Sequence, residues 1–266
     1  MTGIEHLVEP FDQLVKIEKG PVNSAIIDLV RGKVFQVPNH IVFNFKPDDL
    51  SDISQFMKTV QREQKVIDLN QFRRFKEQDP LPKEEQLELE IRLHIEEGAP
   101  LDKILEAFAD YPVKTVYYYG QNPPTILSHN RLLIKREKDF KQCQQRSRID
   151  GHFYPVREEK IRFNKQYNSC WGTSIAFTAD GSIRPCIHSQ IIIDRRANLA
   201  LEDVDGLIEQ MRPYWTLTKD KVNKCLACEF RHLCFDCREI AWRENGDILS
   251  PNPNCKYNPF TGHWNL

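Results

Sequence analysis

The chain has 266 residues, of which 40% are hydrophobic and 28% charged, so it is long and apolar enough to bury a sizeable core. Its 37 Lys and Arg residues balance 38 Asp and Glu residues, and the net charge of −1 argues against broad binding to nucleic acid or to a membrane surface. No apolar run approaches the ~18 residues that span a bilayer. The opening MTGIEHLVEPFDQL carries acidic residues where a secretory signal carries positive charge. These features predict a cytoplasmic protein with no nucleic-acid or membrane partner.

The first 80 residues predict a hairpin and a helix. Residues 24–29 (SAIIDL) and 33–38 (KVFQVP) are rich in β-branched and apolar residues, with a turn between them. Apolar residues then recur at helical spacing over 53–60, and residues 74–88 read as a charged, proline-containing connector. The region 1–80 is similar to small elements that recognise peptides by adding a strand to a sheet edge. An ordinary hairpin that caps a domain is the alternative.

A β–α–β pattern follows and defines a second region, 81–160. Residues 86–97 alternate like a strand, 102–111 predict a helix, and 113–120 predict a second strand. Such alternation suits a parallel sheet with helices packed on it, although the span is far too short for an eight-stranded barrel. The segment that follows, RLLIKREKDFKQCQQR, fits either a strand or a helix.

The third region, 161–266, has a different character. Apolar runs at 173–178 and 183–187 flank an Asp-Gly turn, which is a strong hairpin signal. Residues 201–215 predict a short helix, and a cysteine-rich stretch and a proline-broken tail complete the chain. Taken together, the three regions predict an α+β protein: a hairpin and helix, a reduced β–α–β segment, and a C-terminal domain organised by cysteines.

The eight cysteines are placed unevenly, because none precedes Cys143. Clustered cysteines in a reducing cytosol are more often metal ligands than disulfides. The stretch CLACEFRHLCFDC, residues 225–237, contains two C-x2-C pairs, and such pairs commonly form a four-thiolate site. Zinc and iron–sulfur clusters both accept that spacing.

The wider cysteine pattern narrows the choice. Cys170 and Cys186 flank the predicted hairpin, Gly181 lies five residues before Cys186, and Cys255 follows the dense group. Over residues 165–266 this series resembles the SPASM domain, a C-terminal extension of radical SAM peptide-modifying enzymes whose seven cysteines hold two auxiliary [4Fe-4S] clusters. The general SPASM pattern has three residues within the last pair of the dense group, where this chain has two.

Three further segments resemble a narrower group. CEFRHLCFDCR, CKYNPFTGHW and the early NSAIIDLVRGKVFQVPN are similar to the SPASM maturases of grasp-with-spasm systems. The resemblance implies a protein that takes part in maturation of a ribosomally made peptide. Its implied partners are the precursor peptide and a modifying enzyme, either an ATP-grasp ligase or a radical SAM protein.

The resemblance also implies two ligand sets. The first cluster would be held by Cys225, Cys228, Cys234 and Cys255, and the second by Cys170, Cys186 and Cys237. The fourth position of the second cluster is open in some relatives, and here Cys143 and His188 are the candidates. Two structural zinc ions, with His188 and His232 as additional ligands, are the alternative to two [4Fe-4S] clusters.

One motif is missing. Radical SAM catalysis needs three cysteines at C-x3-C-x2-C, and this sequence has no such trio. We therefore expect no SAM site and no SAM cleavage by this chain alone.

Two functional classes remain. The protein could be a peptide-binding partner, or it could be a redox enzyme or electron carrier that uses an open-site cluster. The sequence therefore leaves open whether the protein is an enzyme. Arg231 and Arg238 lie beside the dense cysteines and are expected to offset thiolate charge.

Overall fold

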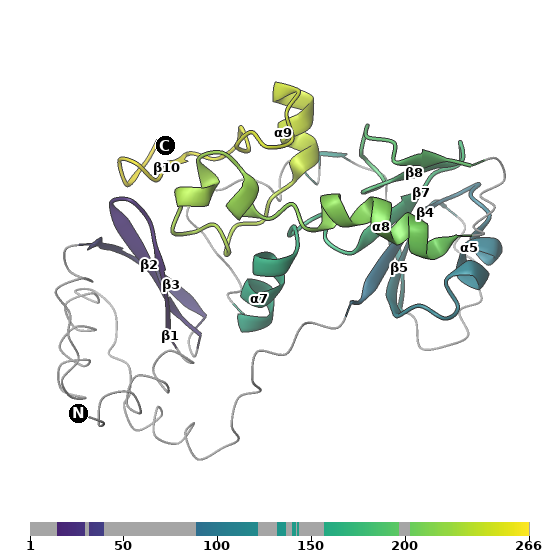
Figure 1. The fold of residues 1–266 in the computed structure, drawn as a ribbon, viewed down its shortest axis with the longest axis horizontal. Coiled ribbons are helices and arrows are strands. Elements are labelled where there is room, and N and C mark those ends of the chain that lie inside the picture. Colours follow the sequence, from purple (N-terminus) through teal and green to yellow (C-terminus); the bar gives the residue numbers. More distant parts are fainter. Residues whose placement is uncertain are drawn as a thin grey trace, which may run out of the picture.

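The computed structural model describes residues 15–29, 32–39, 89–121, 132–136, 140–141, 143, 157–196 and 203–265. Within these residues the fold is α+β, as predicted (Figure 1). The predicted helix over 53–60 and the connector over 74–88 lie outside the described residues. No helix of the described part is long and apolar enough to cross a membrane.

An antiparallel sheet near the N-terminus contains both predicted strands. Its order is β1 (Val15–Lys19), β2 (Asn23–Asp28) and β3 (Lys33–Pro38). β1 was not predicted, because VKIEK alternates with charged residues and has no turn signal at its start. β2 is buried from its second residue onward, and its apolar centre, Ala25 to Ile27, is fully buried.

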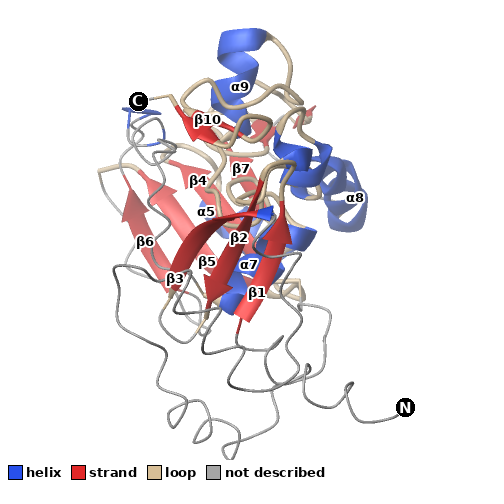
Figure 2. Cartoon of the chain, turned by 90° about the vertical axis from the view of Figure 1, so that its left-hand side faces the viewer, coloured by secondary structure: helices blue, strands red, loops and turns tan. Residues whose placement is uncertain are grey.

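A second sheet has six strands in the order β6-β5-β4-β7-β8-β9 (Figure 2). The first four strands of that order run parallel, and β8 and β9 are added antiparallel beside β7. The sheet does not close into a barrel. Its strands are β4 (Ile91–Glu96), β5 (Val113–Tyr119), β6 (Leu132–Arg136), β7 (Ser174–Phe177), β8 (Ser182–Arg184) and β9 (Asp194–Arg195).

The predictions for this sheet hold, with shifted boundaries. The alternating segment 86–97 becomes a strand only from Ile91, and the ambiguous segment that starts at 131 contains the strand β6. The predicted hairpin around the Asp-Gly turn is β7 and β8, with Phe177 opposite Ile183. Gly181 has φ +78°, a left-handed conformation that glycine adopts without a steric penalty.

Two helices cover one face of the six-stranded sheet. They are α5 (Leu101–Ala107) and α8 (Val204–Trp215), and both correspond to predicted helices. Alternation along β4 places Ile91, Leu93 and Ile95 in the core beneath them. The indole of Trp215 donates a hydrogen bond to the carbonyl of Ser174 at 2.8 Å and fixes the end of α8 to β7.

The remaining elements surround the cysteines and were not predicted. They are α7 (Glu158–Gln166), the 3₁₀ turns η2 (Lys219–Lys221) and η3 (Cys225–Ala227), α9 (Arg238–Asn245), and the paired strands β10 (Tyr257–Asn258) and β11 (His263–Trp264).

The N-terminal sheet packs against the cysteine-rich region. Ala25 and Ile27 of β2 share an apolar cluster with Phe230, Leu233 and Tyr257, residues that lie more than 200 positions later. Apolar burial of this kind is the main source of stability for such a contact.

A carboxylate strengthens the contact. Glu18 of β1 accepts from Arg231 at 3.2 Å, meets His232 Nδ1 at 3.1 Å and pairs with Lys165 at 2.9 Å. Burial alone would raise the pKa of Glu18, but hydrogen bonds from His232 and Lys165 outweigh it and lower the pKa to about 2.

We expect Leu93→Ala to lower the free energy of unfolding by about 2–5 kcal/mol, because it leaves a cavity in the closely packed core under α5 and α8. Urea denaturation measures the change. The matched control is Ile192→Ala, since Ile192 is 44% exposed; it should change stability by less than about 0.5 kcal/mol. Equal effects from the two substitutions would contradict the assignment of Leu93 to the core.

Candidate metal centre

The cysteines are carried by turns between the last helices and strands. Cys225 lies in η3, Cys237 immediately precedes α9, and Cys255 lies just before β10. Cys170 and Cys186 follow α7 and β8. All eight cysteines are free thiols, so disulfides do not hold this region together.

Four thiols form a first group: Cys225, Cys228, Cys234 and Cys255. Burial raises the pKa of Cys225, Cys228 (to about 12) and Cys234. The charge of Cys255 raises all three values further, and Cys225 acts on both Cys228 and Cys234. Each of these three thiols is therefore harder to ionise when another thiol of the group carries a charge.

The second group contains Cys170, Cys186 and Cys237, and Cys143 lies beside it. The Cys170 thiol donates a hydrogen bond to the Cys237 sulfur; this bond raises the pKa of Cys170 and lowers that of Cys237. Burial raises the pKa of Cys186, and the charge of Cys237 adds to it. Cys143 raises the pKa of both Cys170 and Cys186, which places it near this group.

The two histidines named by the zinc alternative have other contacts. Both ring nitrogens of His232 face carboxylates, Nδ1 that of Glu18 at 3.1 Å and Nε2 that of Asp220 at 3.0 Å. The ring of His188 packs against Tyr119 and Phe140, with centroids 6.4 and 5.8 Å apart. The backbone N–H of His188 hydrogen-bonds to the Cys186 thiol, but its ring packs on aromatic side chains. The His232 ring contacts Glu18 of β1 instead.

Within each of the two ligand sets that the SPASM resemblance implies, the thiols affect one another's pKa values, and the ligand assignment itself stays a prediction. Among the described residues, no group of three or more His, Cys, Asp or Glu side chains is arranged to hold a metal ion. A single zinc needs its sulfur ligands about 2.3 Å from one point. A four-iron cluster binds one thiolate at each iron and so spreads its ligands more widely.

Two buried N–H donors bear on the choice between zinc and a cluster. Trp171 Nε1, beside Cys170 and Cys186, and Asn252 Nδ2, near Cys255, are buried and find no acceptor among the described residues. An unsatisfied buried donor costs about 1–3 kcal/mol. The sulfides of an iron–sulfur cluster accept such hydrogen bonds, so a cluster would supply the missing partners.

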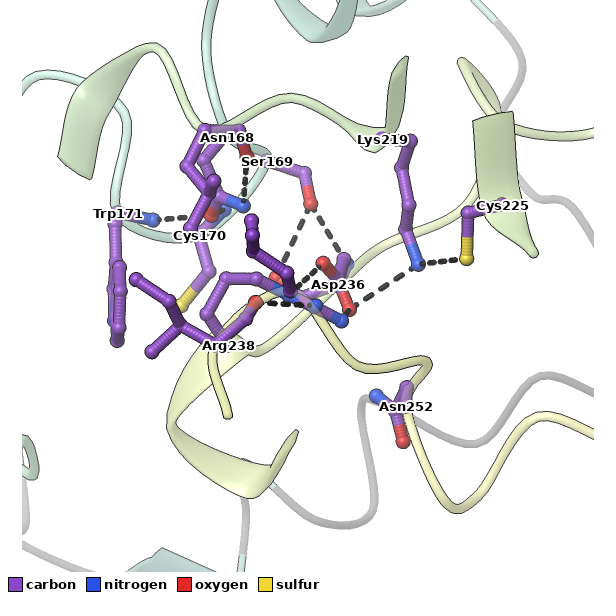
Figure 3. Close-up of polar contacts among 12 residues, drawn as sticks. Asn168, Ser169, Cys170, Trp171, Lys219, Cys225, Asp236, Arg238 and Asn252 are labelled. Atoms are coloured by element: carbon purple, nitrogen blue, oxygen red, sulfur yellow. Dashed lines mark hydrogen bonds and ion pairs between the residues drawn. The ribbon is translucent and has the colours of Figure 1, made fainter. Parts of the chain in front are cut away.

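A hydrogen-bonded frame holds the second group (Figure 3). Asn168 Oδ1 accepts from the amides of Cys170 and Trp171 at 2.9 and 2.8 Å. Ser169 Oγ accepts from the amide of Asp236 at 2.7 Å. Because Ser169 precedes Cys170 and Asp236 precedes Cys237, this bond aligns the two segments that carry the paired thiols.

The charges near the cysteines include one that the sequence did not predict. Arg238 pairs with the carboxylate of Asp236, and its charge also lowers the pKa of Cys225, as expected, whereas Arg231 pairs with Glu18 and Asp220. The unpredicted cation is Lys219, whose Nζ lies 3.8 Å from the Cys225 sulfur. Nothing in the segment TKDKVNK distinguishes Lys219 from its neighbours, so the sequence offered no signal for it.

Comparison with known proteins gives a distant relationship. No protein-family model matches the chain, and no solved structure matches it significantly. It is 24% identical over 122 residues to an AdoMet-dependent heme synthase of Nitratidesulfovibrio vulgaris, which covers 45% of the chain and 32% of that enzyme. It is 37% identical over 84 residues to an uncharacterized protein of Archaeoglobus fulgidus, which covers 31% of the chain and 20% of that protein.

These matches define a class of relationship and no more. The chain covers a third or less of the length of either curated relative. The similarity to an AdoMet-dependent enzyme indicates a general radical-SAM-like relationship. The SPASM assignment and the identity of the metal ligands remain predictions.

We expect mild oxidation of metal-free protein to join Cys170 to Cys237, because these thiols are already hydrogen-bonded to each other. Peptide mapping by mass spectrometry after treatment with diamide measures the pairing. Cys237→Ser is the control and should abolish that product. Predominant disulfides between the two groups in folded protein would show that the grouping is wrong.

Proposed function

We propose that the protein is an iron–sulfur protein of the SPASM type that acts in maturation of a ribosomally made peptide. It binds the precursor peptide, a modifying enzyme such as an ATP-grasp ligase or a radical SAM protein, or both. It does not cleave SAM itself. Its cytoplasmic location and the boundaries 1–80, 81–160 and 161–266 are part of this proposal.

The observation that supports the proposal is that seven buried or partly buried free cysteines affect one another's pKa values in two sets. Cys225, Cys228, Cys234 and Cys255 would hold one [4Fe-4S] cluster, and Cys170, Cys186 and Cys237 the other. Cys143 is favoured over His188 as the fourth ligand of the second cluster, because its charge acts on Cys170 and Cys186. When bound, such clusters supply one-electron transfer.

The distant similarity to a heme synthase supports an iron–sulfur protein of the radical SAM type, but it gives little support for a heme-like substrate. The match covers only 32% of that enzyme, and the chain lacks the C-x3-C-x2-C trio that SAM cleavage needs. A tetrapyrrole substrate therefore has less support than a peptide, for which the motifs around Cys228–Arg238 and Cys255–Trp264 argue by resemblance.

A redox enzyme or electron carrier is the second candidate. Cys143 is only partly buried, so an accessible iron could be left at the second cluster if this thiol does not ligate. Such an iron could bind a substrate group or pass electrons to a partner.

We expect anaerobically purified, reconstituted protein to be brown and to hold about eight irons per chain. Cys228→Ser and Cys186→Ser should each retain about four, because each substitution disables one cluster. Iron analysis and absorbance spectra measure this, and Cys143→Ser tests the fourth ligand. A colourless protein with about two zinc ions would support the zinc alternative instead.

We also expect the reconstituted protein, incubated with SAM and dithionite, to form no 5′-deoxyadenosine, because no trio of cysteines can bind SAM. Under the same conditions it should bind precursor peptides encoded beside its gene and leave their mass unchanged. Chromatography and mass spectrometry measure both. A change in peptide mass with reductant alone would favour the redox enzyme, and a failure to bind any such peptide would contradict the binding role.

A further inference from the structure

Lys219 is a buried cation in a region of thiols. It opens the 3₁₀ turn η2 and is only 6% exposed. Lysines are almost never buried to this extent unless their ammonium groups are paired. Its Nζ has two partners, Asp236 Oδ1 at 3.2 Å and the Cys225 sulfur at 3.8 Å (Figure 3).

The two cations that pair with Asp236, Lys219 and Arg238, carry one positive charge more than its carboxylate neutralises. Its carboxylate is shared by Lys219 and by Arg238, which donates from Nη2 at 2.6 Å and pairs through Nε as well. Arg238 also donates to the carbonyls of Ile248 and Ser250, which are neutral. Two buried cations therefore face one carboxylate, and the remaining acceptor of the Lys219 ammonium is the sulfur of Cys225.

The same contacts join the two groups of thiols. Asp236 is adjacent to Cys237 in the chain, and its amide is held by Ser169, the neighbour of Cys170. Its side chain reaches in the other direction, through Lys219, to Cys225. The charge of Lys219 therefore acts on Cys225 of the first group, whereas its position is fixed by Asp236, the neighbour of Cys237 in the second group.

We propose that Lys219 is a positioning residue that sets the reduction potential of the first iron–sulfur centre. This inference rests on the proposed function, which assigns Cys225 as a ligand of that centre. Reduction adds an electron, and the additional negative charge is stabilised by a nearby cation that donates a hydrogen bond to a ligand sulfur. Lys219 therefore raises the potential of the centre held by Cys225 above the value it would have with a neutral residue at 219.

The test is a redox titration of the full chain after anaerobic reconstitution, monitored by electron paramagnetic resonance. Lys219→Met removes the charge and the donor but keeps the volume, and Asp236 remains paired with Arg238. We expect the iron content to be unchanged and the first centre to become about tenfold harder to reduce, about 59 mV for a one-electron couple. Cys225→Ser identifies which signal belongs to that centre.

Two comparisons separate charge from structure. Lys221→Met is the matched control, because Lys221 lies in the same turn, is exposed, and directs its ammonium to Thr216 Oγ1 at 3.4 Å; this variant should leave both potentials unchanged. Lys219→Arg keeps a cation and a donor and should restore most of the potential. If Lys219→Met does not hold iron, Lys219→Gln replaces it, and a negative shift is again expected.

The outcomes distinguish the inference from the function on which it rests. Normal iron content with an unchanged potential in Lys219→Met, or in Lys219→Gln where that variant replaces it, overturns the role of Lys219 and leaves the iron–sulfur function intact. A wild-type protein that binds no iron overturns the proposed function itself. Equal shifts in Lys219→Met and Lys221→Met would overturn the specific contact to Cys225.

Discussion

The constraint on which this structure depends is the burial of thiols in two crowded groups. Burial raises the pKa of Cys186, Cys228 and Cys234, and neighbouring thiolates raise these values further. Cys237 is the exception, because the hydrogen bond from Cys170 lowers its pKa. Metal binding by thiolates reverses this balance, because the positive centre stabilises several thiolates at once. Apolar clusters around Phe230 and Trp171 also pack against these thiols, so the region has hydrophobic contacts as well.

The N-terminal sheet is joined to the first group of thiols by both apolar and charged contacts. Phe230, Leu233 and Cys234 belong to the same apolar cluster as residues of β2, and Glu18 of β1 meets Arg231 and His232. The N-terminal sheet, which the sequence analysis assigned to a separate region, therefore packs directly against the segment that carries Cys234. If this sheet receives a peptide strand at its edge, the peptide would lie close to the first group rather than at a remote recognition site.

The sequence predicted the elements whose apolar spacing is regular. The parallel strands, the two helices that cover them and the hairpin around Gly181 follow from periodicity and turn chemistry. It did not predict α7 and α9, because their polar composition gives no clear apolar stripe. The SPASM resemblance implied the two ligand sets, and local spacing did not, because the C-x2-C pair of Cys234 and Cys237 is divided between them. Lys219 and Asp236 could not be found this way, because their roles depend on contacts between turns far apart in the chain.

The pairing of β4 with β7 brings residues 92–95 beside residues 174–177, two segments that are far apart in the sequence. Arg92 of β4 then donates to the carbonyls of Cys170 and Gly172 and holds the turn that carries the Cys170 thiol. The position of the Cys170 turn therefore depends on contacts between segments 78 and 80 residues apart. The first group lies within residues 225–255 and can come together locally. A substitution that weakens the pairing of β4 with β7 would therefore disturb the turn of Cys170 before it disturbs the segment 225–255.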